Sequence, residues 1–304
     1  MSGRILVIRG GAIGDFILTM PAIRLLRESF PEAQIEILGY PAITALARDV
    51  HHADATHSIE YGPLAGFFSR RPALEPELAA FFANFHQIVS YLYDPDRIFE
   101  TNLRRTGVKN LLSGPGKLTD EIHAVHQLAR PLERLALFLE DPCAHFFPTV
   151  QDEAAAAVFL RRTNRPFVAI HPGSGSSRKN WPLERWSELI PQIQNAGAQV
   201  LLTAGEADEV IAGALEERFS TLVASHLPLR TLGAILSRAT LYIGNDSGIS
   251  HLAAASGCRC ILLFGPTDPD IWAPQNPGVT VIRSPNSEMD AIDIAHVLKS
   301  AGFL

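Results

Sequence analysis

Residues 171–182 read HPGSGSSRKNWP and combine two glycines, three serines, an arginine and a lysine. The segment follows an apolar run and precedes a helical pattern. Backbone N–H groups around Ser174 and Gly175 can cradle phosphate oxygens, and Lys179 supplies a point charge. The lysine does not follow a glycine, so the spacing of a P-loop is absent. The segment therefore predicts a phosphate site outside the ATPase class; the alternative is a Ser/Gly turn with an exposed lysine.

A second glycine-rich loop, RGGAIGD at 9–15, lies between a strand-like run and an amphipathic pattern. Gly11 and Gly14 permit a tight turn and close approach of the backbone to a ligand, and the N–H groups that begin the next helix face the same place. The second strand ends LGYP without an acidic residue, which disfavours NAD binding in this half. Asp15 is either a helix N-cap or a carboxylate at an interdomain cleft that can accept a proton.

Glu206, in LLTAGEADE, follows another apolar run of the second half. A Rossmann-type domain places there the acid that binds a nucleotide ribose. The first turn of a helix also favours a carboxylate, so both interpretations stay open for this residue.

The fourth loop is GNDSGISHLAAASG at 244–257, where Asp246, Ser247 and Gly248 begin a helix of small residues. The N-terminus of such a helix attracts anions, and its alanine-rich face permits close approach. The alternatives are that Asp246 is only a cap and that His251 is only a core histidine.

Strand-like and helical patterns alternate along the chain and position these loops. Strands are expected at 4–9, 34–40, 87–93, 109–114, 167–171, 199–203, 240–244, 259–264 and 279–283, with helices between them, including 15–29, 120–140 and 288–301. Such alternation predicts parallel sheets covered by helices, and its restart in the second half predicts two Rossmann-like domains. Because ligands of such sheets bind beyond the carboxyl ends of the strands, the loops of the second half predict a nucleotide-diphosphate site there.

Composition and charge exclude several classes of partner and site. Residues 1–150 carry 14 Lys and Arg against 17 Asp and Glu, and residues 151–304 carry 12 against 15, so neither half has the basic balance that nucleic acid requires. No apolar window reaches the roughly 18 residues of a membrane span, which predicts a cytoplasmic protein. Three cysteines make no disulfide framework. Two D-P-D triplets, at 94–96 and 268–270, have the spacing of some metal-binding motifs but are interpreted as proline turns, so no metal is expected.

These motifs together resemble glycosyltransferase family 9, the bacterial ADP-heptose:lipopolysaccharide heptosyltransferases. The likeness rests on ILVIRGGAIGDFILTMPAIRLLRESFPEAQIEIL, HPGSGSSRKNWPLERWSELI, TAGEADE and GNDSGISHLAAASGCRCILLFGPTDPDIWAP, in this order. The resemblance implies a GT-B fold, with two Rossmann-like domains whose parallel sheets face a central cleft. The domains would be an acceptor-binding domain at 1–155, a donor domain at 156–285 and a C-terminal helix at 286–304 that packs back toward the first domain.

The resemblance also implies an inverting, metal-independent transfer of a sugar, heptose from ADP-heptose, to a hydroxyl of a lipopolysaccharide-core or related saccharide, with no further cofactor. Asp15 would be the general base, and Lys179 would stabilise the leaving diphosphate. The donor would contact Gly11, Gly14, Ser174, Gly175, Lys179, Glu206, Asp246, Ser247, Gly248 and His251.

Two other functions stay open, a nucleotide-sugar epimerase and a non-catalytic nucleotide-sugar binding protein.

A lipid-linked acceptor would require peripheral contact with the cytoplasmic face of the inner membrane. Exposed aromatic residues in GPLAGFFSRRP at 62–72, namely Phe67 and Phe68, are the expected contact points.

Overall fold

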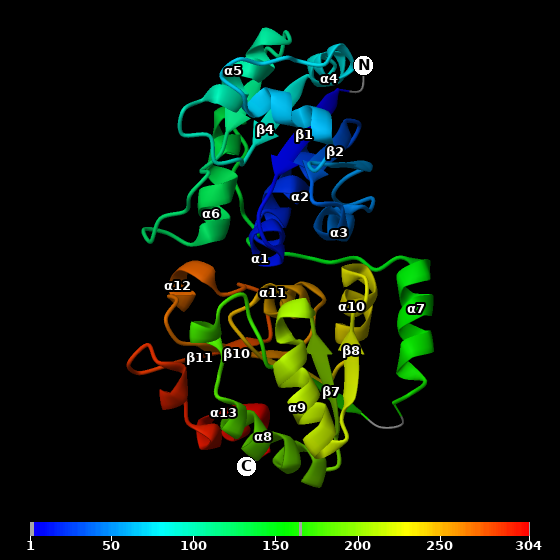
Figure 1. Cartoon of the computed structure of the whole chain (residues 1–304), viewed down its shortest axis with the longest axis vertical. Helices are drawn as coiled ribbons and strands as arrows, with labels where there is room; N and C mark the ends of the chain where they lie inside the picture. Colours follow the sequence, from blue (N-terminus) through cyan, green and yellow to red (C-terminus); the bar gives the residue numbers. More distant parts are fainter. Residues whose placement is uncertain (1–2, 164–165, 304) are drawn as a thin grey trace. The chain divides into compact units, whose positions relative to one another are not determined.

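The computed structural model describes residues 3–163 and 166–303. The chain divides into two compact units, Met1–Pro142 and Cys143–Leu304, each built on its own sheet (Figure 1). The division lies ahead of the boundary expected after residue 155. The helix α7 (Val150–Leu160) spans the expected boundary and packs against α10 (Leu229–Leu236) of the second unit.

The first unit contains a five-stranded parallel sheet in the order β3-β2-β1-β4-β5. Its strands are β1 (Arg4–Arg9), β2 (Gln34–Gly39), β3 (Ala55–Ser58), β4 (Gln87–Ser90) and β5 (Leu111–Ser113), and its helices are α1 (Ile13–Ile17), α2 (Met20–Ser29), α3 (Pro41–Thr44), α4 (Pro76–Ala83), α5 (Ile98–Arg105) and α6 (Ala124–Ala129). Strand β1 is central and apolar because it is buried between neighbouring strands and helices.

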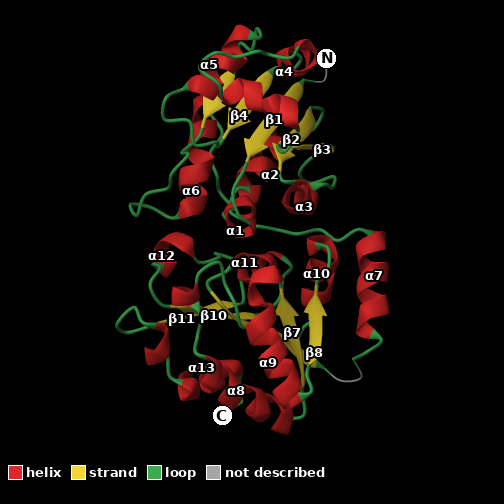
Figure 2. Ribbon diagram, in the orientation of Figure 1, coloured by secondary structure: helices red, strands yellow, loops and turns green. Residues whose placement is uncertain are grey.

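The second unit contains a six-stranded parallel sheet in the order β11-β10-β9-β6-β7-β8. The strands are β6 (Phe167–His171), β7 (Gln199–Ala204), β8 (Leu222–Ser225), β9 (Leu241–Asn245), β10 (Cys260–Phe264) and β11 (Val279–Arg283). The helices besides α7 and α10 are α8 (Leu183–Asn195), α9 (Glu209–Phe219), α11 (Gly248–Ala255), α12 (Pro269–Trp272) and α13 (Ile294–Ala301). The expected α/β class with two parallel sheets is confirmed (Figure 2).

Two of the expected helices are interrupted, and a proline lies near the break in each case. The helix expected at 15–29 is two helices, because the chain turns between α1 and α2 and Pro21 takes the second position of α2, where its missing N–H costs nothing. The helix expected at 120–140 is α6 followed by a 3₁₀ turn, Arg130–Leu135, which contains Pro131.

The final helix, α13, contributes to the core of the second unit. Val297, Leu298 and Ala301 of α13 are buried in the core of the second unit, and the helix contacts α8 and β10 there. Burial of its apolar face stabilises an amphipathic helix, and the core of the second unit buries this face of α13.

The link between α7 and α10 gives a pH-dependent prediction. Asp152 accepts hydrogen bonds from Arg230 Nε (2.9 Å) and from the backbone N–H of Thr149 (2.7 Å). Burial by itself would raise the pKa of Asp152, but the hydrogen bonds from Arg230 and Thr149 outweigh it and lower the pKa. The ionised carboxylate therefore stabilises the fold at neutral pH, and this stability is lost as the pH falls through the lowered pKa.

We expect Asp152→Asn to reduce the free energy of unfolding at pH 7 by about 1–2 kcal/mol, because a charge-assisted contact is lost. The difference from the wild type should begin to shrink as the pH falls below about 4, where the carboxylate of the unfolded chain becomes protonated, and should be lost once the pH lies below the lowered pKa of the folded chain. Urea unfolding of both proteins at pH 7 and at a pH below about 4 measures this difference in unfolding free energy. A difference that is the same at both would assign the loss to packing rather than to the charge.

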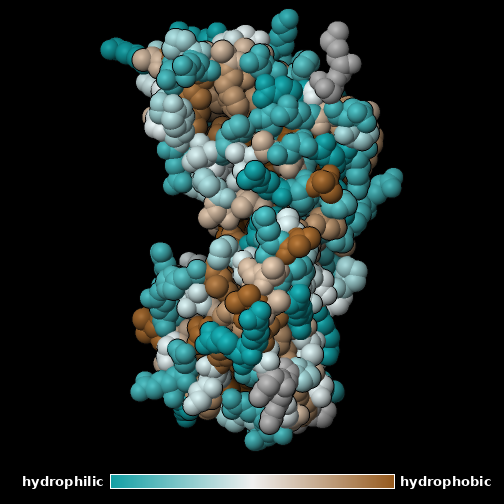
Figure 3. Space-filling view, turned by 90° about the vertical axis from the view of Figure 1, so that its right-hand side faces the viewer, coloured by the Kyte–Doolittle hydropathy of each residue, from teal (hydrophilic) through white to brown (hydrophobic). Residues whose placement is uncertain are grey.

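The surface shown in Figure 3 carries mostly hydrophilic residues, with hydrophobic ones scattered among them. Within the described residues, no helix combines the length and apolar composition that crossing a bilayer requires.

The expectation that Phe67 is exposed is wrong: its side chain is fully buried, edge-on to Phe82, in the core of the first unit. Phe68 is 47% exposed and stacks on Phe99.

Candidate functional site

Four loops meet at one edge of the second sheet. They follow β6, β7, β9 and β10, which are neighbours in the order β10-β9-β6-β7. All four strands are parallel, so their carboxyl ends share this edge. The loops at 172–182, 205–208, 246–248 and 265–268 are therefore close in space, as the sequence predicts.

Lys179 forms the most direct link between two of these loops. Its Nζ lies 2.7 Å from Asp246 Oδ2, and Thr267 Oγ1 donates a hydrogen bond of 2.6 Å to the same oxygen. The Asp246 side chain is only 8% exposed, whereas that of Lys179 is 30% exposed. The ammonium group is thus held at the edge of the sheet with part of its surface open to a ligand. Thr267 was not among the residues expected in the site.

Asn245, at the end of β9, fixes the two ends of the loop that carries Lys179. Its buried side chain donates to the carbonyl oxygen of Pro172 (2.8 Å) and accepts the N–H of Trp181 (3.2 Å). Between these ends, Ser174 Oγ accepts the N–H of Ser176 (3.2 Å). The loop is therefore ordered by side chains rather than by a strand or long helix. Asn245 was missed because its partners lie far away in the sequence.

Beneath the loop, Asp208 and His171 form a buried pair. Their Oδ2 and Nε2 atoms are 3.5 Å apart, and His171 Nδ1 lies 2.9 Å from the carbonyl oxygen of Thr203. Burial is the main influence on His171 and lowers its pKa, which favours the neutral ring at pH 7. A Cβ atom on Gly173 would lie 1.7 Å from Asp208 Oδ1, so the loop can pass over this pair only with glycine at that position.

The two glycines of this loop give a matched pair of substitutions. We expect Gly173→Ala to lower the free energy of unfolding by about 1–3 kcal/mol, because the new methyl group overlaps a buried carboxylate. Gly175→Ala should leave the stability unchanged, since no atom lies within 4 Å of a Cβ placed there. Denaturant unfolding of the two variants measures the difference. Equal stability of both variants would contradict the tight packing of Gly173 on Asp208.

Helix α11 begins at the same edge with Gly248. Ser247 is its N-cap, and the Ser247 hydroxyl accepts the N–H of Ser250 at 3.2 Å. His251 is buried one turn into the helix. Glu206 is exposed and lies in the short turn after β7, so the structure brings it to the same edge through its loop rather than through a contact with Lys179 or Asp246.

In the first unit, Asp15 lies at the third position of α1 rather than at the N-cap. Its Oδ2 accepts the N–H of Ala12 at 3.1 Å, and its side chain is 38% exposed. Gly11 has a φ of +97°, and a Cβ there would lie 2.9 Å from Asp15 Oδ2, so the turn requires glycine. Gly14 is half-buried in the first turn of the helix. The carboxylate thus has a local structural role and a face that is open to solvent.

Arg9, which was not among the expected site residues, supports Asp15 from the end of β1. Its Nη2 lies 3.3 Å from the carbonyl oxygen of Asp15 and 3.7 Å from Asp15 Oδ1. Burial lowers the pKa of Arg9, while the charge of Asp15 acts in the opposite direction. An arginine stays protonated in proteins, so a buried positive charge lies directly beside the Asp15 carboxylate.

The first aspartate of each D-P-D triplet has a structural role. Asp94, in the first of two D-P-D triplets, accepts the N–H groups of Ile98 and Glu100 at the start of α5. Asp268, in the second, caps α12 through the N–H of Asp270. In the ranges 3–163 and 166–303, no group of three or more His, Cys, Asp or Glu side chains is arranged to hold a metal ion.

Comparison with known proteins adds a family and a fold. The model of glycosyltransferase family 9 (heptosyltransferase) matches residues 121–301. Lipopolysaccharide heptosyltransferase 3 of Escherichia coli K12 is 27% identical over 283 residues, which is 86% of this chain and 82% of that protein.

Among solved structures, a glycosyl transferase family 9 protein from Veillonella parvula matches with a TM-score of 0.83 and 18% identity, over 99% of this chain and 96% of that one. An E. coli heptosyltransferase solved with ADP matches with a TM-score of 0.73 and 19% identity, over 98% and 99%. These structures confirm the expected GT-B fold.

Proposed function

This chain belongs to glycosyltransferase family 9, and on that premise we propose that it transfers heptose from ADP-heptose to a hydroxyl of a lipopolysaccharide-core or related saccharide. The observation that carries the proposal is the Lys179–Asp246–Thr267 arrangement at the loop edge of the second sheet. A partly exposed ammonium group beside a helix N-terminus and a serine-glycine loop suits a nucleotide diphosphate.

In this proposal the second unit binds the donor. Lys179 and the N–H groups of the loop at 174–175 contact the diphosphate, and the start of α11 at Gly248 faces it. Gly175 favours this role, because the structure leaves open space where a side chain would stand and so permits a ligand to approach the backbone. Glu206 would bind the ribose, and Ser247 and His251 would complete the donor site, whereas Gly11 and Gly14 would bring the backbone of the first unit toward the donor.

The chemistry follows from the charges of these residues. The acceptor hydroxyl forms a bond to the anomeric carbon as the bond to the diphosphate breaks, so the configuration at that carbon inverts. Asp15 accepts the proton of the hydroxyl, and the electron pair of the broken bond leaves on ADP. Lys179 and the backbone N–H groups stabilise the negative charge that grows on the diphosphate, the task that a divalent cation performs in other transferases. We therefore expect activity to persist in EDTA.

Calorimetric titration of ADP, UDP, GDP, CDP and dTDP into the full chain, without added metal, tests the donor assignment. The proposal predicts that ADP binds most tightly. Preference for another nucleotide would keep a transferase and reject ADP-heptose as the donor, and the absence of binding to all five would reject the donor site.

Two rival functions have distinct outcomes. A nucleotide-sugar epimerase would convert the donor to an epimer without any acceptor, because no second substrate is required. A non-catalytic binding protein would bind the nucleotide sugar and leave it intact with every acceptor. Incubation of ADP-heptose alone, followed by mass spectrometry and NMR of the sugar, separates both from a transferase.

A lipid-linked acceptor would place the enzyme at the cytoplasmic face of the inner membrane, and we propose Phe68 as a contact point. Its ring is half exposed, whereas that of the neighbouring Phe67 is buried. Phe68→Ser should reduce co-sedimentation with anionic liposomes by several-fold, since an inserted aromatic ring contributes on the order of 1–2 kcal/mol. Tyr93→Ser, which removes another exposed ring, is the control. Equal pelleting of wild type and Phe68→Ser would exclude this contact.

A further inference from the structure

Arg9, the last residue of β1, is a buried arginine that the proposed chemistry does not use. Its side chain is 9% exposed, and within the described residues Asp15 is the one carboxylate with which it forms an ion pair. Its Nε atom is buried and has no hydrogen-bond partner in the same part of the chain. Removing a guanidinium group from water is costly, and one partner that is 38% exposed recovers little of that cost. Stability alone therefore does not account for a cation at this strand end.

The contacts of Arg9 converge on the turn that carries Asp15. Its Nη2 atom lies 3.3 Å from the main-chain carbonyl oxygen of Asp15 and 3.7 Å from Oδ1 of the same residue. The hydroxyl group of Thr19 donates a hydrogen bond of 2.8 Å to that carbonyl oxygen as well. The second carboxylate oxygen, Oδ2, accepts the N–H of Ala12. Of the two groups that hold the carboxylate oxygens, only Arg9 comes from another element.

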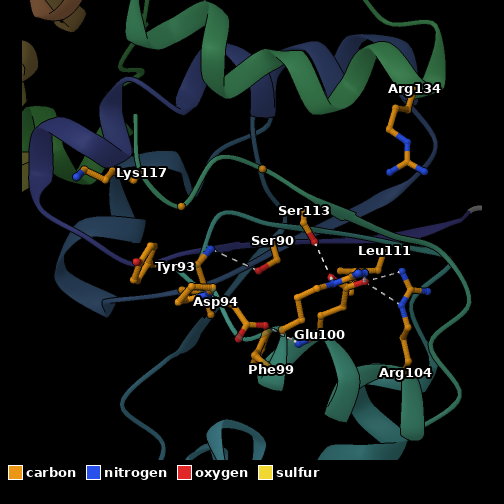
Figure 4. A pocket seen from close by; sticks show the side chains of 15 residues that line it. Ser90, Tyr93, Asp94, Phe99, Glu100, Arg104, Leu111, Ser113, Lys117 and Arg134 are labelled. Atoms are coloured by element: carbon orange, nitrogen blue, oxygen red, sulfur yellow. Dashed lines mark hydrogen bonds and ion pairs between the residues drawn. The ribbon is translucent and has the colours of Figure 1, made fainter. Parts of the chain in front are cut away.

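The end of β4 holds Arg9 from its other side. The Nη1 atom lies 3.5 Å from the carbonyl oxygen of Tyr91, the residue that follows β4. The N–H of Tyr91 continues the pairing with β1, and its hydroxyl donates to the carbonyl oxygen of Leu128 in α6 at 2.9 Å. The neighbouring residues Ser90 and Tyr93 line a hollow of about 530 Å³ (Figure 4). Arg9 thus connects the Asp15 turn to a strand end that two other elements fix.

The charge of Arg9 has a second consequence for Asp15. Arginine stays protonated in proteins, and a cation within about 4–6 Å favours the ionised form of a carboxylate. Tyr91 is the other titratable group that acts on Arg9, and burial raises the pKa of its phenol, so it stays neutral. A proton that Asp15 accepts therefore reaches a carboxylate beside one permanent positive charge.

We propose that Arg9 is a positioning residue for the general base: it fixes the orientation of the Asp15 carboxylate and extends proton acceptance to lower pH. The inference rests on the proposed transferase function, in which Asp15 takes the proton of the acceptor hydroxyl. Arg9 is buried and acts through Asp15, not on the substrate. Its contribution is therefore visible in the pH dependence of transfer rather than in the affinity for ADP.

Replacing Arg9 by methionine removes the charge and keeps an unbranched apolar stem. We expect the acid limb of the profile of kcat/KM against pH to move upward by about 1–2 units, since no neighbouring cation then favours the carboxylate. The value of kcat/KM above that limb should fall by about 10–10², the consequence of a misplaced base. A uniform loss at every pH, without a shift of the acid limb, would overturn the proposal.

Arg27→Met is the matched control. Arg27 lies in the same unit, pairs with the partly exposed carboxylate of Asp54, and donates to the carbonyl oxygen of Ala33 at 2.8 Å. It therefore combines the same two kinds of contact as Arg9, away from Asp15. Its replacement should leave the pH profile unchanged. An equal shift in both variants would assign the effect to the net charge of the unit rather than to Arg9.

Arg9→Lys tests orientation separately and covers the case in which Arg9→Met does not fold. Lysine keeps the charge but lacks the planar fork that reaches both the carbonyl oxygen and Oδ1 of Asp15. The acid limb should stay close to that of the wild type, whereas kcat/KM above it should fall several-fold. A lysine variant with the wild-type kcat/KM at every pH would reject the role in orientation.

Carbon-detected NMR of the Asp15 carboxyl group separates this inference from the proposed function, because it requires no turnover. In the substrate-free full chain, the titration midpoint should rise by about 1–2 pH units from wild type to Arg9→Met and stay unchanged in Arg9→Lys. That result in a chain that transfers no sugar would keep the effect of Arg9 on Asp15 and reject the transferase. An unchanged midpoint in Arg9→Met, with transfer intact in the wild type, would reject the role of Arg9 alone.

Discussion

Replacing Asp15 by alanine is expected to reduce turnover by a factor of about 10²–10⁴, the range that a positioned general base contributes. The affinity for ADP should stay within about twofold of the wild type, because the residues proposed to bind the diphosphate and the ribose lie in the second unit. Initial rates of ADP release with saturating donor, together with ADP titration, measure both quantities.

A structural contribution of Asp15 has to be separated from a catalytic one, because its Oδ2 also accepts the N–H of Ala12. Asp15→Asn retains an oxygen for that hydrogen bond and removes the basic carboxylate. We expect Asp15→Asn to unfold at nearly the wild-type denaturant concentration and to be about as inactive as the alanine variant. An asparagine variant with wild-type turnover would exclude Asp15 as the base.

Replacing Lys179 by alanine is expected to lower kcat/KM for the nucleotide sugar by about 10²–10³. The reason is that a preorganised positive charge beside the leaving diphosphate is lost. The affinity for ADP should fall as well, since the ground-state diphosphate is charged. Arg178→Ala is a matched control, because it removes the same charge from the neighbouring position of the same loop. Equal losses in the two variants would assign the effect to general electrostatics rather than to Lys179.

The Lys179 variant also leaves Asp246 without its cation. Asp246 is almost completely buried and would retain Thr267 as a hydrogen-bond donor, so we expect a loss of about 1–3 kcal/mol in unfolding free energy. Adding Asp246→Asn to Lys179→Ala should recover part of that stability without restoring ADP affinity. Recovery of both would mean that Lys179 acts only by neutralising Asp246.

Much of the fold can be predicted from the alternation of apolar runs and helical patterns. The runs that became central strands, such as β1, β9 and β10, are continuous and fully buried, which is why their apolar character is clear in the sequence. Two edge strands, one in each sheet, were missed. β3 reads ATHS and β8 reads LVAS, and each is only partly buried, so neither needs an apolar run that pattern reasoning can detect.

The site could be predicted to the level of its loops but not to the level of its contacts. Parallel strands place their following loops at one edge, so the association of the loops that carry Lys179 and Asp246 follows from the order of strands. Thr267 and Asn245 were not predicted, because each acts through a residue 21 or more positions away. Arg9 was missed because a charged residue at the end of an apolar strand is normally assigned to the surface.

The most direct test of the central claim is to incubate the full chain with ADP-heptose and a lipopolysaccharide-core saccharide in EDTA, and to determine ADP release and the configuration of the product. The account predicts one ADP for each new glycosidic bond, inversion at the anomeric carbon, and loss of both signals in Asp15→Ala. Release of no ADP with any such acceptor, or a glycoside that retains the donor configuration, would contradict it.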